Sequence, residues 1–102
     1  MSALPPEVLD EIEAREGAWS FYSSDNRLRL SAVWEDVIEV ARTSDWWKRE
    51  TDDHHVAIDG WKDSMTGCDT HGRRIYLTGK WVYYRGERRW FVITYHEDER
   101  ST

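Results

Sequence analysis

The stretch "GKWVYYRGERRWFVITYHED", residues 79–98, holds two runs of β-branched and aromatic residues on either side of a glycine. Runs of this composition are typical of β-strands, and a glycine between them is typical of a hairpin turn. We therefore predict strands over 80–85 and 88–96, joined by a turn at Gly86 and Glu87. The preceding run "RRIYL", residues 73–77, predicts a further strand of the same sheet.

Alternation along the last strand predicts which of its side chains share a face of the sheet. One face would hold Trp90, Val92, Thr94 and His96, and the other would hold Phe91, Ile93 and Tyr95. One of the two faces must pack on the rest of the chain, which leaves the other face open to solvent.

The first half of the chain reads as helical. Pro5 and Pro6 followed by "EVLDEIEAREG" predict a helix over about 6–16, because proline and acidic residues favour a first helical turn. Apolar residues at three-to-four spacing predict a second helix over about 32–42, with a preceding turn from 25 as an extension. Between the two helices, 18–24 reads as a short strand or an extended linker.

The remaining segments complete the predicted sheet. Residues 45–51 and 54–61 read as short strands, and 63–72, "DSMTGCDTHG", reads as a loop. The expected architecture is α+β and a single domain over 1–102. Two N-terminal helices, within about 6–42, would pack on a C-terminal antiparallel sheet of about four to five strands within about 45–96.

Charge is distributed unevenly along the chain. The 20 acidic and 14 basic residues give a formal net charge of −6, which argues against nonspecific binding to nucleic acid or to anionic membranes. Residues 71–96 nevertheless carry a net charge of +5, whereas the first 70 residues carry −9. A local basic patch of this kind can hold phosphate on an acidic protein.

The sequence lacks the signals of export and of membrane insertion. The N-terminal residues do not have a basic region followed by an apolar run, and no apolar segment approaches the roughly 18 residues needed to span a bilayer. The single Cys68 excludes an internal disulfide. We expect a cytoplasmic protein with no membrane partner.

A cluster of potential metal ligands follows the first predicted strand. The run "DDHH", residues 52–55, is followed by Cys68 and His71. Adjacent histidines point to opposite sides of a strand, and no second spaced pair of ligands completes a zinc motif. We therefore expect neither a metal site nor a cofactor.

The predicted hairpin carries the residue types that metal-independent RNA cleavage requires. This chemistry needs a base, an acid and cations that stabilise the charge on phosphorus. The candidate catalytic residues are His71, Lys80, Tyr84 and His96, and the candidate substrate-binding residues are Arg73, Arg74, Arg85, Arg88 and Arg89. The alternative is that these cations balance the acidic helices and that the aromatic residues stabilise the sheet.

The helix "RLRLSAVWEDVIEVART" and the sheet "GRRIYLTGKWVYYRGERRWFVITYHED" together resemble the RelE/ParE/MqsR class of small toxins, within the wider barnase–colicin–RelE nuclease fold. This resemblance of pattern covers about two thirds of the chain. It implies a metal-independent endoribonuclease of a toxin–antitoxin pair, which cleaves RNA such as ribosome-bound mRNA and is held inactive by a cognate antitoxin. It also implies that Lys80, Arg73 or Arg74 stabilises charge, and that Tyr84, Tyr95, His71 or His96 transfers protons. Such toxins are usually basic, whereas this chain is acidic.

A second interpretation treats the protein as a non-enzymatic inhibitor or adaptor that docks on a basic partner, or as an immunity or antitoxin-like protein. The 16 acidic residues among the first 70 favour it. Trp46, Trp47 and Trp61 also favour it if they lie at the surface, since tryptophan is a frequent interface anchor. Their alternative role is core packing.

Overall fold

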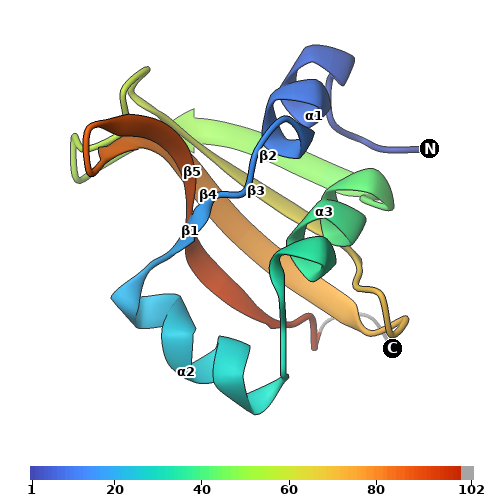
Figure 1. The fold of residues 1–102 in the computed structure, drawn as a ribbon. Helices are drawn as coiled ribbons and strands as arrows, with labels where there is room; N and C mark the ends of the chain where they lie inside the picture. Colours follow the sequence, from blue (N-terminus) through green and yellow to red (C-terminus); the bar gives the residue numbers. More distant parts are fainter. Residues whose placement is uncertain (100–102) are drawn as a thin grey trace.

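The computed structural model describes residues 1–99, and within them it has three helices and a five-stranded mixed sheet (Figure 1). The elements are α1 (Pro6–Glu13), β1 (Ala18–Trp19), α2 (Phe21–Arg29), α3 (Trp34–Arg42), β2 (Trp46–Thr51), β3 (Trp61–Cys68), β4 (Arg74–Tyr84) and β5 (Glu87–Glu97). The α+β class is therefore confirmed, with helices mostly N-terminal and the sheet mostly C-terminal.

The sheet has the strand order β1-β5-β4-β3-β2. Its four long strands are antiparallel, and the short β1 adds to the outer edge of β5 in parallel. The predicted antiparallel sheet is thus extended by one N-terminal strand. In Figure 1, α1 and α3 lie on one side of the sheet, while α2 lies beside the end of β5.

One hydrophobic cluster fills the space between the sheet and the helices α1 and α3. Ile12 from α1 and Val37 and Val40 from α3 are fully buried in it. From the sheet it receives Met65, Ile75, Leu77, Trp81, Trp90, Val92 and Tyr95. We call this side of the sheet the core face and the other side the open face.

The predicted hairpin is present, with two differences in detail. Residues 73–77 and 80–85 were predicted as separate strands, but 74–77 and 80–84 belong to one continuous strand, β4. The turn between β4 and β5 is made by Arg85 and Gly86, whose φ angles are 53° and 78°. Two consecutive residues with positive φ in a two-residue loop match a type I′ turn, whose twist fits a hairpin.

The predicted faces of the last strand are wrong at its C-terminal end because β5 contains a bulge. Thr78 pairs with Thr94 and Gly79 pairs with Val92, so β5 has one extra residue at Ile93. The extra residue reverses the alternation beyond it. Tyr95 therefore lies on the core face, whereas His96 lies on the open face.

Glycine at position 79 explains how the core closes beside this bulge. A Cβ atom on Gly79 would lie 2.4 Å from the ring of Trp90, a distance that real contacts do not reach. The Trp90 indole lies against the bare backbone and is 1 % exposed. The largest side chain of the core is thus accommodated by the smallest residue of the neighbouring strand.

Helix α2 was predicted only as a turn from 25 preceded by an extended segment. Ser20 caps it, because the Ser20 hydroxyl accepts a hydrogen bond from the Ser23 N–H at 3.1 Å. Its large apolar residues Phe21, Tyr22 and Leu28 are exposed. A helix without an apolar stripe toward the core leaves no periodic signal in the sequence.

The predicted loop 63–72 is wrong for 63–68, which belong to β3, and right for 69–72. The predicted strand 54–61 is wrong except for Trp61, the first residue of β3. Residues 52–60 form the connection that precedes β3. The polar side chains of β3 are buried but find partners: Ser64 with Thr78 at 2.9 Å, and Thr66 with Asp45 at 2.8 Å. Hydrogen bonds of this kind allow a polar segment to occupy the middle of a sheet.

Candidate functional site

A buried ion pair fixes the connection 52–60 to the sheet. The Lys80 ammonium lies 3.0 and 3.1 Å from the two carboxylate oxygens of Asp52, and the side chains are 7 % and 1 % exposed. The backbone N–H groups of His54, Val56 and Ala57 also donate to this carboxylate. Burial alone would raise the pKa of Asp52, but the hydrogen bonds from Ala57, Lys80 and Val56 outweigh it and lower that pKa.

The Asp52–Lys80 pair is neutral overall. Both described hydrogen bonds of the Lys80 ammonium go to the Asp52 carboxylate. The three backbone amides add hydrogen bonds to the same carboxylate without changing its charge, so they hold the connection 52–60 against Lys80.

Lys80 lines a groove on the open face, with a volume of about 580 Å³. Its buried floor is formed by Lys80 and Val82, and its rim includes the exposed Phe21, Tyr22 and Val56. The other lining residues are Ser20, His54, Tyr83, Tyr84, Phe91 and Ile93. We call this hollow the aromatic groove.

The structure separates the four candidate catalytic residues. Lys80 and Tyr84 both line the aromatic groove. His71 lies exposed in the loop between β3 and β4, and His96 lies near the C-terminal end of β5. The hydroxyl of Tyr95, a further candidate for proton transfer, is buried in the core, and burial raises its pKa.

Most of the candidate substrate-binding cations form ion pairs within the chain. Their carboxylate partners are Asp69 for Arg73, Asp45 and Asp98 for Arg74, Glu11 for Arg88 and Glu87 for Arg89. Arg85 is the exception: among the described residues it has no carboxylate partner, and its guanidinium lies 5.3 Å from the centre of the Tyr84 ring. Arg85, the one candidate substrate-binding arginine without an ion pair among the described residues, therefore lies beside the aromatic groove.

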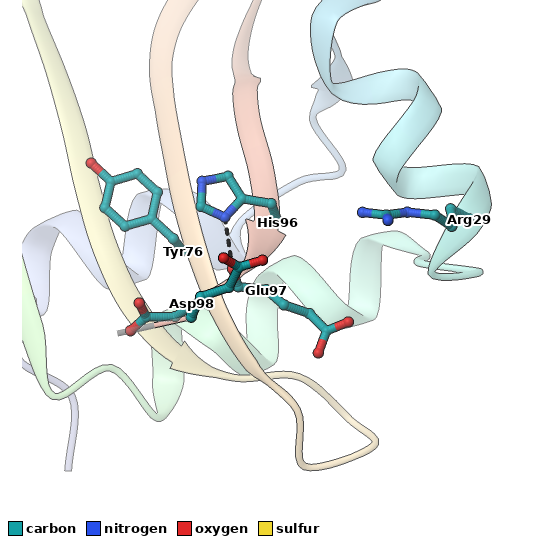
Figure 2. Close-up of a pocket in the computed structure, with 6 residues that line it drawn as sticks. Arg29, Tyr76, His96, Glu97 and Asp98 are labelled. Carbon is teal, nitrogen blue, oxygen red and sulfur yellow. Dashed lines mark hydrogen bonds between the residues drawn. The ribbon is translucent and has the colours of Figure 1, made fainter. Parts of the chain in front are cut away.

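A second hollow lies at the opposite end of the open face (Figure 2). Trp46, Tyr76 and His96 occupy one cross-strand row, with ring centres 6.3 Å apart for Trp46–Tyr76 and 5.3 Å apart for Tyr76–His96. Both pairs are stacked, so Tyr76 is covered on each face by a neighbouring ring. The His96 Nδ1 lies 2.8 Å from the Glu97 carbonyl oxygen, and Arg29 faces His96 across the hollow in Figure 2.

The helices α1 and α3 carry most of the surplus negative charge. Glu13 and Arg42 form an ion pair between these two helices, which lie next to each other in Figure 1. We define the acidic helix surface as the carboxylates Glu7, Asp10, Glu11, Glu13, Glu16, Glu35 and Glu39. Against these seven acidic groups, residues 6–16 and 34–42 contain two arginines, Arg15 and Arg42.

The tryptophans singled out in the sequence lie partly at the surface. Trp46 and Trp61 are 39 % and 44 % exposed, whereas Trp47 is half-buried and packs against the core. Trp46 contributes to the stacked row, and Trp61 begins β3.

Two negative findings concern only the part of the chain that the structure describes. No group of three or more histidine, cysteine, aspartate or glutamate side chains there could hold a metal ion. No helix there is long and apolar enough to cross a membrane.

Several residues in the groove or paired with its floor did not stand out in the sequence. Asp52 drew notice only as a potential metal ligand, and Phe21 and Tyr22 belong to the helix that was not predicted. Ser20 is the signal that could have revealed this helix, because serine is a preferred N-cap and its side chain accepts a hydrogen bond from the Ser23 N–H. A helix that begins there has Phe21 and Tyr22 in its first turn.

Comparison with known proteins gives no relative: no protein-family model matches the chain, and no curated protein and no solved structure is significantly similar to it. The function must therefore be inferred from the contacts and charges of the chain itself.

Proposed function

We propose that this chain is a non-catalytic binding protein, an inhibitor or adaptor, that docks on a basic protein partner through the acidic helix surface. The observation that carries the proposal is the distribution of charge. The cations of the hairpin are largely neutralised within the chain. Of the seven carboxylates on or next to the two adjacent helices, only Glu11 and Glu13 form an ion pair among the described residues, with Arg88 and Arg42. Such a surface attracts a basic partner at long range and discriminates against acidic ones.

The shape of this region also suits an interface. A hollow of about 340 Å³ lies between the end of α1 and the start of α3. Val33, Trp34 and Ile38 contribute apolar surface to it. Its charged lining is three glutamates, Glu13, Glu16 and Glu35, and one arginine, Arg15, so the net charge is negative. Apolar residues at the centre with polar residues around them are the usual organisation of a protein–protein interface.

RNA cleavage remains a prediction of the sequence, and the geometry supports it less well. A nuclease needs its acid, its base and its cations around one phosphate. Here Lys80 is paired with Asp52 in the aromatic groove, while His96 belongs to the hollow at the other end of the open face. Five of the six basic residues between 71 and 96 form ion pairs within the chain.

The experiment compares two triple variants that change the net charge equally. Asp10→Lys/Glu35→Lys/Glu39→Lys reverses charge on the acidic helix surface, and Asp25→Lys/Asp53→Lys/Glu97→Lys reverses it elsewhere. The tagged proteins are used to capture partners from a lysate of the source cells, and the captured protein is then purified and its Kd measured. Circular dichroism verifies that both variants are folded.

We expect a captured protein that is basic, that loses affinity for the helix variant, and that binds the control variant as well as wild type. Raising the salt from 0.05 to roughly 0.5 M should weaken its binding, because exposed charges are screened over about 10 Å at 0.1 M. Equal binding of the two variants, or a partner whose affinity does not depend on salt, would contradict the proposal.

A further inference from the structure

The aromatic groove combines apolar walls with two cationic groups. The Lys80 ammonium lies on its floor, paired with Asp52, and the guanidinium of Arg85 lies beside it with no carboxylate partner among the described residues. A ligand anion next to Tyr84 would give the Arg85 guanidinium a charged acceptor. The groove is on the open face, on the other side of the sheet from the acidic helix surface.

The walls of the groove fit a planar ring. Tyr84 and Phe91 lie side by side with ring centres 6.2 Å apart and an angle of 33° between the rings. Phe21 and Tyr22 extend from the first turn of α2 on the rim and are 89 % and 82 % exposed. Exposed aromatic residues gathered around one hollow are unusual on a soluble protein surface and mark binding sites.

We propose that the aromatic groove binds an aromatic ring that carries an anionic group. The ring lies against Tyr84 and Phe91, and the anion accepts hydrogen bonds from the Lys80 ammonium and from Arg85. The anion complements the Arg85 guanidinium and the Lys80 ammonium, whereas a cationic ligand would be repelled by both groups and an uncharged ligand would gain no charge-assisted hydrogen bond from them. This chemistry has two sources, an aromatic carboxylate or a nucleotide with its base and phosphate. The inference is independent of the acidic helix surface.

The test uses three small probes and protein amide NMR. The probes are 3-phenylpropionate, its uncharged analogue 3-phenylpropionamide, and adenosine 5′-monophosphate. We expect 3-phenylpropionate to shift the amide signals of residues 52–57, 80–84 and 91–93 with saturation and a Kd of about 1–10 mM, the range usual for a ligand of this size. The uncharged analogue should bind at least about fivefold more weakly, as expected for a lost charge-assisted hydrogen bond.

Variants separate the groove from a general effect of charge. Arg85→Gln should weaken 3-phenylpropionate binding by about two- to fivefold, the range for a solvent-exposed ion pair. Arg29→Gln is the matched control, because Arg29 is also an exposed arginine but lies at the other hollow of the open face. Tyr84→Ala, which removes one wall, should weaken binding of both anionic probes.

The two anionic probes identify the source of the ligand. Tighter binding of the nucleotide than of 3-phenylpropionate assigns the site to nucleotides, and the reverse order assigns it to aromatic carboxylates. The proposal is overturned if neither anion gives saturable shifts at the groove, if the uncharged analogue binds as well as the acid, or if Arg85→Gln and Arg29→Gln behave alike.

Discussion

Replacing Lys80 by methionine tests whether this residue is a structural partner of Asp52 or a free catalytic cation. Methionine keeps most of the length of the apolar stem but removes the ammonium that lies 3.0 Å from the Asp52 carboxylate. Removing one partner of a buried ion pair typically costs about 3–5 kcal/mol, because the other charge is left buried and unpaired. Asp52 keeps its three backbone hydrogen bonds, so we expect a loss near the lower end, about 3 kcal/mol.

The assay is urea unfolding followed by tryptophan fluorescence, with calorimetry as a second measurement. A loss of about 3 kcal/mol in a domain of this size lowers Tm by about 12–24 °C. Lys62→Met is the matched control, because Lys62 lies 4.0 Å from Asp53, whose side chain is 82 % exposed, and such a pair contributes at most about 1 kcal/mol.

The double variant Asp52→Asn/Lys80→Met provides a second check. It removes both charges, so it should be more stable than Lys80→Met alone by about 1 kcal/mol or more, since the uncompensated carboxylate is gone. A Lys80→Met variant that loses less than about 1 kcal/mol, or a double variant no more stable than the single one, would refute the reasoning that Lys80 balances a buried charge.

Three further predictions concern stability. Burial alone would raise the pKa of Asp36 and Asp52, but their hydrogen bonds outweigh it and lower both pKa values in the folded protein. The stability that these groups provide is therefore present above the unfolded carboxyl pKa of about 3.9 and is lost as the pH falls below it. Urea unfolding between pH 6 and 2.5 should show this loss, and Asp52→Asn should reduce its slope. Gly79→Ala should cost about 1–3 kcal/mol because its methyl group would collide with the Trp90 ring, and unchanged thermal unfolding would show that the ring is not confined there. Arg85→Asn should stabilise the hairpin by up to about 1 kcal/mol because asparagine tolerates positive φ better than arginine; a lower Tm would indicate that the contact between Arg85 and Tyr84 contributes more than the backbone strain.

The hairpin and the helix α3 could be predicted because their signals are local. Apolar residues at three-to-four spacing mark α3, and Gly86 between two strand-like runs marks the turn. Strand β3 gave no such signal, because Ser64 and Thr66 are stabilised by Thr78 and Asp45, which are distant in the sequence. The bulge at Ile93 is likewise a property of strand pairing, and it moved His96 to the open face.

The candidate site was predictable only in part for the same reason. The composition of the hairpin predicted Lys80 and Tyr84 as catalytic residues and Arg85 as a substrate-binding residue. Lys80 and Tyr84 line one groove, and Arg85 lies beside it. Asp52 forms an ion pair with Lys80, which lies 28 residues away in the sequence. Phe21 of α2 also lines the groove, although it is far from the hairpin in the sequence. Composition indicates which residues can do chemistry, but the topology decides which of them meet.

The most direct test of a non-catalytic role is to induce the gene in cells, follow growth, and examine total RNA on a gel beside His71→Ala, Lys80→Ala and His96→Ala variants. A binding protein leaves the RNA intact in the wild type and in all three variants. Fragmented RNA with growth arrest in the wild type, relieved by a variant that circular dichroism shows to be folded, would contradict this role and identify a catalytic group.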